Sequence, residues 1–302
     1  MLQGGRLFGR QAYVGLSNAR LGSVTFGRQY DCLVDFVSPF TSAKQWGTQY
    51  GAHVGDADNL YNAFRINNSL KYTSRTWRGV TLGALYGFSN QAGGSSGTGF
   101  ANDRAWSVGA SYRMGGFSAG AGYLFVNNPS AGNANGTNAN GAVAGDYTSA
   151  TNIFYVRPVA RQAVVAAGAA YQFGKATAGL VYSQSKIDYM DRSSFGVHNI
   201  EANLSWRLQP SLVTGIAAIY SDGFVDGAGG IANVATTTHP RWLQINVGTD
   251  YAVSKRTDLY AAVIWQKAEG GAAAAAIDAV GGPTGAGGRY QIATQLGVRT
   301  KF

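Results

Sequence analysis

The C-terminal segment of the chain alternates between two kinds of side chain, and this pattern constrains the fold more than any other feature. In residues 290–302 one set of alternate positions is mostly apolar or aromatic and the other is mostly polar or basic. Successive side chains of a β-strand point to opposite faces. The segment is therefore predicted to be a strand with one apolar face and one hydrated face. The apolar set is Tyr290, Ile292, Leu296, Val298 and Phe302, opposite Gln291, Gln295, Arg299 and Lys301.

Similar segments of about ten residues recur along the whole chain, separated by turn residues. A soluble sheet needs a second apolar layer to cover its apolar face, and segments suited to such a layer are not evident. Lipid outside and water inside satisfy the pattern instead. We predict an all-β fold, an antiparallel up-and-down transmembrane β-barrel, with about thirteen strands in a single domain, residues 1–302.

The phase of several strands can be read directly. In the segment 62–73 we expect Phe64, Ile66, Leu70 and Tyr72 to face lipid and Arg65, Asn67, Ser69 and Lys71 to face the lumen. Short connections are predicted at 75–79, 115–116, 174–175, 209–210 and 254–257. Long connections rich in Gly, Ala, Asn or Ser are predicted at 90–103, 127–150, 188–196, 222–239 and 268–289.

Composition argues against other functional classes. The net charge of +9 could indicate a nucleic-acid partner, but the basic residues are scattered singly, so we expect none. The three histidines, His53, His198 and His239, lack metal-ligand spacing, and no nucleophile with a paired base is evident. We expect no enzyme activity, cofactor or metal. Cys32, the single cysteine, cannot form an internal disulfide.

The connection 30–61 is too long for an ordinary barrel turn, and loops of this length are usually functional. Folded into the lumen, it would set acidic groups opposite a basic wall. A solvated surface loop is the alternative that composition leaves open. Its acidic residues are Asp31, Asp35, Asp56 and Asp58.

Five segments, in this order and spacing across nearly the whole chain, resemble the general porins of β-proteobacteria. They are GRQAYVGL (9–16), GRQYD (27–31), RINNSLKY (65–72), SKRTDLY (254–260) and GVRTKF (297–302). The resemblance implies a sixteen-stranded, water-filled barrel, usually a homotrimer, in the Gram-negative outer membrane. It also implies that residues 30–61 fold inward as a constriction loop, and that Phe302 acts as the outer-membrane insertion signal.

The resemblance assigns pore-lining roles to individual residues. Arg10 and Arg65 match the positions of constriction arginines, and the alternation of residues 62–73 places Lys71 in the same wall as Arg65. The acidic residues of 30–61 would face them. A further arginine from an earlier strand has no counterpart here.

The start of the chain departs from the family pattern. Family members begin with a signal peptide and about three strands before the position of Met1, so we expect an N-terminally truncated chain. An open barrel would leave unsatisfied strand edges in lipid.

These observations predict passive diffusion of small hydrophilic solutes and ions, with weak anion preference. The expected partners are copies of the same chain, outer-membrane lipids and lipopolysaccharide, and the barrel assembly machinery. Two alternatives remain: an adhesin or receptor barrel, which would display residues 30–61, and a non-functional porin fragment.

Overall fold

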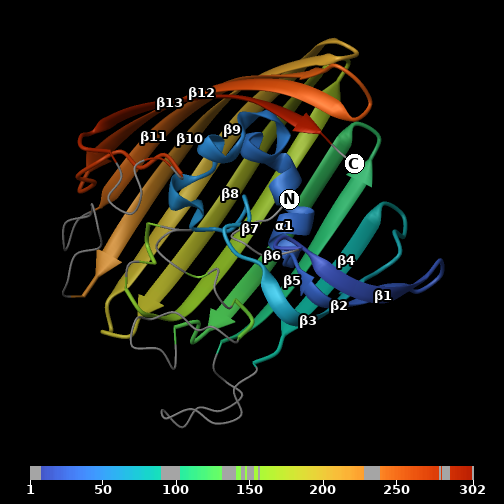
Figure 1. The fold of residues 1–302 in the computed structure, drawn as a ribbon, viewed down its shortest axis with the longest axis horizontal. Coiled ribbons are helices and arrows are strands. Elements are labelled where there is room, and N and C mark those ends of the chain that lie inside the picture. The colour runs from blue at the N-terminus through green and yellow to red at the C-terminus, as the bar shows by residue number, and fades with distance from the viewer. Residues whose placement is uncertain are drawn as a thin grey trace.

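The structure is a computed structural model that describes residues 8–89, 103–130, 141–143, 147, 153–155, 157–227, 239–278, 280 and 286–300. Its described strands form one thirteen-stranded antiparallel sheet in which each strand pairs with its neighbours in the sequence (Figure 1). The predicted all-β, up-and-down fold is therefore confirmed. The strands are β1 (Ala12–Asn18), β2 (Gly22–Gln29), β3 (Ile66–Thr73), β4 (Val80–Gly87), β5 (Arg104–Met114), β6 (Phe117–Asn127), β7 (Val159–Phe173), β8 (Ala176–Tyr189), β9 (Ser194–Gln209), β10 (Leu212–Asp226), β11 (Pro240–Ala252), β12 (Thr257–Gly270) and β13 (Tyr290–Thr300).

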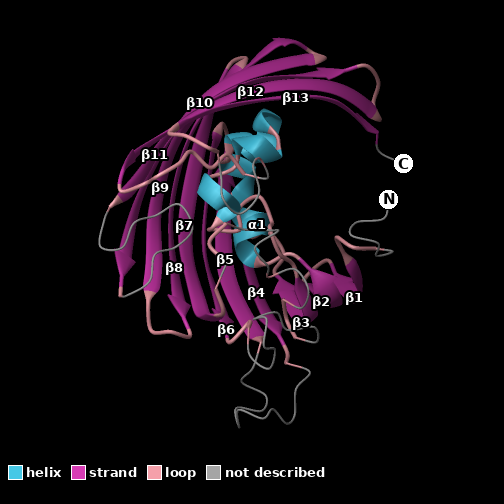
Figure 2. Cartoon of the chain, turned by 60° about the vertical axis from the view of Figure 1, so that its left-hand side comes forward, coloured by secondary structure: helices cyan, strands magenta, loops and turns pink. Residues whose placement is uncertain are grey.

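The sheet curves into an incomplete barrel. In the described part of the chain, β1 pairs only with β2 and β13 pairs only with β12, so the sheet is not closed. Figure 2 shows β1 and β13 on the two sides of this opening, with the strands wrapped around a set of short helices.

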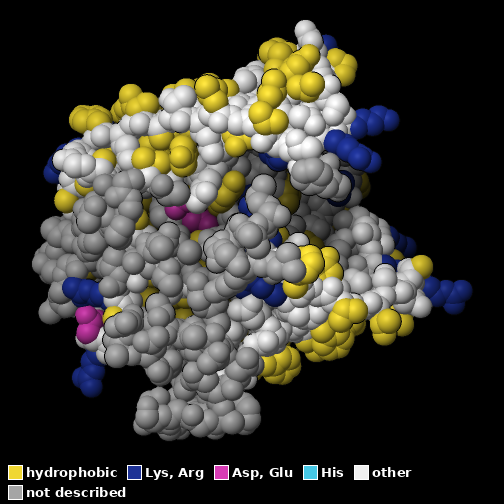
Figure 3. Space-filling view, viewed as in Figure 1, with side chains coloured by type: hydrophobic (Ala, Val, Ile, Leu, Met, Phe, Trp, Pro, Cys, Tyr) yellow, Lys and Arg dark blue, Asp and Glu magenta, His cyan; other side chains and the backbone are white. Residues whose placement is uncertain are grey.

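The strands alternate as the sequence predicts. In β9, Ile200, Leu204 and Trp206 are exposed on the convex face, whereas Asn199, Glu201 and Asn203 are buried on the concave face. Figure 3 shows hydrophobic side chains along the outer rim of the sheet. An apolar convex face and a polar concave face are typical of a membrane barrel.

The predicted orientation of side chains at the start of β3 is wrong. Phe64 and Ile66 do not face outward; both are fully buried in the protein core, while Tyr72 is exposed as expected. The pairing of β2 with β3 shifts register between Gly27 and Gln29, and Asn68 has a φ of 47°. Such a bulge reverses the faces of the residues that precede it.

The five predicted short connections are turns. Gly115 and Gly174 have φ values of 57° and 61°, a conformation that glycine adopts without steric cost. One predicted long connection, 188–196, is wrong: β8 continues to Tyr189 and β9 begins at Ser194. Asp191 accepts hydrogen bonds from the backbone N–H and hydroxyl of Ser193, which closes a tight turn. The other four long connections lie partly outside the described residues.

The segment between β2 and β3 lies on the concave side of the sheet (Figures 1 and 2). We call residues 30–65 the inner segment. It contains α1 (Cys32–Phe36), η1 (Ser38–Phe40), η2 (Ala43–Gly47), η3 (Gln49–Gly51) and η4 (Val54–Asp56). Among the described residues, no helix is both long and apolar enough to cross a membrane.

Candidate pore lining

The inner segment docks on the sheet through aromatic side chains that fit against wall glycines. Phe36 lies over Gly83 and Gly109, and Phe40 lies over Gly168. Trp46 lies over two glycines farther along the sheet, Gly215 and Gly248. A Cβ atom at Gly215 would collide with the indole ring. Part of the glycine content of the chain therefore serves close approach of the inner segment to the wall.

Two of the predicted acidic residues hold the inner segment in shape. Asp31 caps α1 by accepting from Leu33 N at 2.7 Å, and it also accepts from the Asn59 amide at 2.8 Å. Asp56 accepts from the backbone N–H groups of Tyr61 and Ala63 at 2.8 and 2.7 Å. Both carboxyl groups are buried, and burial raises the pKa of Asp31 to about 6 and that of Asp56 well above its usual value.

A third acidic residue joins the inner segment to the wall. Asp58 Oδ2 lies 2.6 Å from His53 Nδ1, and it accepts a hydrogen bond from the Ser183 hydroxyl of β8. His53 Nε2 lies 3.2 Å from Glu201 Oε2 on β9. Glu201 Oε1 accepts from Ser42 N at 2.6 Å.

The histidine in this group is positively charged. Both of its ring nitrogens face carboxylate oxygens, an arrangement that a doubly protonated imidazolium satisfies. Burial alone would lower the pKa of His53, but Asp58 and Glu201 outweigh it and raise the pKa to about 10. Burial would raise the pKa of Asp58, but His53 and Ser183 lower it. His53, Asp58 and Glu201 therefore form a buried ionic anchor.

The fourth acidic residue pairs with the basic wall. Asp35 forms an ion pair with Lys71 of β3, and Lys71 Nζ also donates to the carbonyl oxygen of Tyr30 at 2.8 Å. Burial raises the pKa of Asp35, and Lys71 opposes that shift. Asp35 thus joins the inner segment to a basic residue of the wall through an ion pair.

A cavity of about 830 Å³ separates the inner segment from the free end of the sheet. Arg10 lines it from the segment before β1, and Lys44 and Tyr61 line it from the inner segment. Gln295 and Arg299 line it from β13. We call this space the eyelet. Both the wall and the inner segment thus contribute basic side chains to the eyelet.

Lys44 is a basic residue of the eyelet that the sequence analysis missed. Its ammonium donates to the carbonyl oxygen of Tyr61 at 3.1 Å and lies 4.6 Å from the centre of the Tyr61 ring. Burial lowers the pKa of Lys44, Asp56 opposes that shift, and Arg10 and Arg65 add to it, so that the pKa is about 8. A lone lysine in a loop carries no periodic signal, so only the fold brings it to Arg10.

Arg65 lies at the end of the inner segment rather than within β3. It donates to Asn62 Oδ1 at 2.9 Å, and its charge acts on Lys44. The structure thus places Arg10 and Arg65 close enough to Lys44 for their charges to interact. Lys71 lies apart from it, in the pair with Asp35. Phe302 lies outside the described residues.

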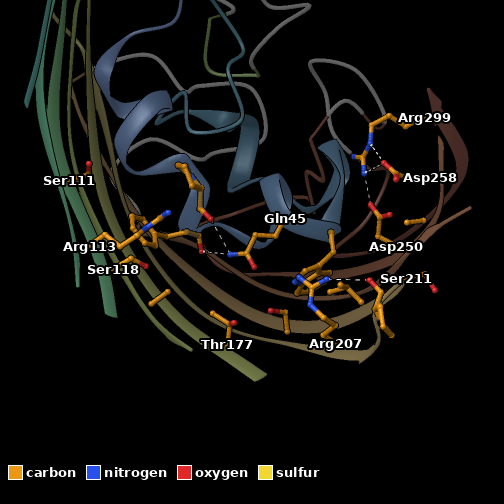
Figure 4. A pocket seen from close by; sticks show the side chains of 18 of the residues that line it. Gln45, Ser111, Arg113, Ser118, Thr177, Arg207, Ser211, Asp250, Asp258 and Arg299 are labelled. Atoms are coloured by element: carbon orange, nitrogen blue, oxygen red, sulfur yellow. Dashed lines mark hydrogen bonds and ion pairs between the residues drawn. The ribbon is translucent and has the colours of Figure 1, made fainter. Parts of the chain in front are cut away.

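A second cavity, of about 570 Å³, lies at the end of the sheet that carries the short turns (Figure 4). It shares Gln45, Trp46, Asp250 and Arg299 with the eyelet, so the two spaces adjoin. We call it the vestibule. Arg299 is held there by Asp258 at 3.0 Å and by Asp250, as Figure 4 shows.

A family model for Gram-negative porins matches residues 3–271, most of the chain. The chain belongs to the Gram-negative porin family. This porin chain is 35% identical over 88 residues to an outer membrane porin protein of Bordetella pertussis. That match covers 29% of the chain and spans 22% of the length of the Bordetella protein. Family and relative together assign the chain to the Gram-negative outer membrane.

Solved porins share the fold at low identity. An anion-selective porin from Comamonas acidovorans has a TM-score of 0.68 and 19% identity, over 98% of this chain and 78% of that one. OmpT of Vibrio cholerae has a TM-score of 0.64 and 14% identity, over 96% and 80% of the two chains. OmpF of Salmonella typhi has a TM-score of 0.57 and 19% identity, over 96% and 77%.

Proposed function

We propose that this porin chain forms the wall and the constriction of a water-filled diffusion channel for small hydrophilic solutes and ions. In this proposal residues 30–61 are the constriction loop, and the protein is a channel rather than an enzyme. The observation that carries it is the eyelet, where Arg10 on the wall side and Lys44 on the inner segment line one cavity.

The position of the inner segment supports a channel over an adhesin or receptor barrel. An adhesin displays its long loop outward, whereas this segment is pinned to the concave face by the ionic anchor. A folded-in loop narrows a lumen and makes it selective.

We further propose that the channel prefers anions weakly. Arg10, Arg65 and Lys44 set positive potential at the eyelet, and cationic lining raises the local concentration of anions. The similarity in fold to an anion-selective porin is consistent with this preference. The pair of Lys71 with Asp35 moderates it by neutralising one basic group.

The proposal includes closure of the sheet and assembly. Each unpaired backbone group in lipid costs several kcal/mol, so the free edges of β1 and β13 need further antiparallel strands in the membrane. A homotrimer is proposed because the similar OmpT of Vibrio cholerae is described in a trimer form. The match to a Bordetella porin supports a β-proteobacterial source.

Planar-bilayer recording tests the function. We expect stepwise conductance that rises with KCl concentration and a reversal potential directed toward the chloride equilibrium potential in a KCl gradient. Purified protein that inserts without conductance steps would refute the channel, and a cation-directed reversal potential would refute the anion preference. Replacing Arg10 and Lys44 together by Gln should move the reversal potential toward zero, whereas Arg256→Gln, in a turn outside both cavities, should not.

A further inference from the structure

The vestibule holds two arginines that lack an acidic partner. Arg113 on β5 and Arg207 on β9 both line it. In the described part of the chain neither guanidinium forms an ion pair, and the single hydrogen bond from the Arg207 guanidinium is a 3.4 Å contact to the carbonyl oxygen of Pro210. The basic group at the far side, Arg299, is by contrast neutralised by Asp250 and Asp258. Positive charge is therefore left available on one side of the vestibule.

Hydroxyl groups lie between the two arginines. The strand register places Arg113 opposite Ser118 on β6, and Thr177 on β8 opposite Ser205 on β9. Arg207 follows Ser205 on the same face of β9. Figure 4 shows Ser118 and Thr177 between Arg113 and Arg207, all on the concave wall.

These hydroxyls differ from other serine hydroxyls on the concave face of the sheet. Ser183 and Ser221 are buried and bonded to other side chains. Within the described residues, no hydrogen bond engages the side chains of Ser118, Thr177 or Ser205. They are free to bind a solute. We call the part of the vestibule wall that runs from Arg113 to Arg207 the strip. Its largest apolar side chain is the methyl group of Ala170.

We propose that this strip is a binding station for hydroxylated organic anions, such as phosphorylated or carboxylated sugars. Guanidinium groups pair with phosphate or carboxylate oxygens through charge-assisted hydrogen bonds, and serine and threonine hydroxyls donate to and accept from sugar hydroxyls. Four inter-strand steps of about 4.8 Å separate β5 from β9, so the strip suits an elongated solute rather than a single small ion. This proposal rests on the proposed channel function. It names a class of solute that would bind in the vestibule, beside the eyelet.

Solute-induced block of chloride current tests the station. Glucose 6-phosphate should reduce the conductance half-maximally at a concentration on the order of 1 mM, as expected of a transient site. Gluconate should block similarly, and glucose should not. The double substitution Arg113→Gln and Arg207→Gln should raise the half-blocking concentration of glucose 6-phosphate about tenfold, because the phosphate loses its charge-assisted hydrogen bond at either end of the strip. Arg256→Gln removes one positive charge outside the vestibule and should leave block unchanged.

Other outcomes overturn the station. Equal block by inorganic phosphate and glucose 6-phosphate would exclude the hydroxyl strip, and block lost in Lys44→Gln but kept in the double variant would locate binding in the eyelet. Calorimetric titration of detergent-solubilised protein with glucose 6-phosphate separates the two proposals. Heat that depends on Arg113 and Arg207 without any bilayer conductance would refute the channel and retain the station. Conductance without such heat or block would refute the station alone.

Discussion

His53 and Glu201 join the inner segment to strand β9 through a 3.2 Å contact between Nε2 and Oε2, although 148 residues separate them in the sequence. Asp58 holds the other ring nitrogen at 2.6 Å. Because all three side chains are buried, the anchor depends on all of its partners. The position of the inner segment is thus set by a charge group that spans loop and wall.

Removing one member of this anchor should release the inner segment. Glu201→Gln leaves a buried imidazolium with one carboxylate, and breaking a buried pair typically costs about 3–5 kcal/mol. We expect a lower midpoint of thermal unfolding and noisier single-channel current. Glu269→Gln is the matched control, because Glu269 pairs with Lys267 at an exposed site, where solvent screening leaves a salt bridge little effect on stability. An unchanged midpoint in Glu201→Gln would contradict the anchor.

The anchor should persist over a wide pH range. The pKa of His53 is raised, so its contribution to stability is complete below its unfolded value of 6.5 and is lost as the pH rises through about 10. The pKa of Asp58 is lowered, so its contribution is present above 3.8 and is lost as the pH falls through the folded value. Thermal unfolding of the native chain and of His53→Gln should therefore converge above pH 10. A difference that stayed constant from pH 7 to pH 11 would rule out a charged His53.

Anion preference should fall as Lys44 loses its proton. The pKa of Lys44 is about 8, so the ammonium is charged at pH 6 and largely neutral at pH 10. A unit charge at 4 Å in water contributes about 1 kcal/mol, so we expect the chloride-to-potassium permeability ratio to drop about two- to fivefold across this range. Lys44→Gln should show the low ratio at every pH. Reversal potentials in a KCl gradient measure the ratio, and a pH-dependence retained in Lys44→Gln would assign the titration elsewhere.

Gly215, where Trp46 packs against the wall, should tolerate no side chain. A methyl group at Gly215 would overlap the indole ring, so Gly215→Ala must displace Trp46 from the wall. Overpacking of this kind costs about 1–3 kcal/mol, and the displaced ring would enter the vestibule that it lines. We expect lower stability together with lower single-channel conductance. Gly288→Ala is the control, because no atom lies within 4 Å of a Cβ at that position.

Neutralising Asp35 should strengthen anion preference. Asp35→Asn leaves the Lys71 charge without its ion-pair partner beside the lumen. The chloride-to-potassium permeability ratio should rise by about twofold, less than a fully exposed charge would give, because Lys71 is itself mostly buried. Asp191→Asn removes a carboxylate from an exposed turn pair with Arg157 and serves as the control. Equal ratios in Asp35→Asn and the native chain would show that this pair does not face the ion path.

The sequence by itself determined the strands, their faces and most of their turns. Alternation with a period of two is a property of the extended backbone, so the sequence placed Ile292 and Leu296 on the exposed face without any knowledge of neighbouring strands. The prediction from alternation failed at Asn68, where the backbone leaves the extended geometry. The bulge there turns Phe64 and Ile66 inward.

Only the tertiary structure decided what the inner segment does. Its short helices have no repeating pattern, and their place depends on aromatic rings that meet glycines of distant strands. The same docking brings His53 to Glu201 and Lys44 to Arg10, so that acidic residues expected to face the pore instead hold the segment in shape. Such contacts depend on where the chain is folded back in space, which a local pattern of side chains does not encode.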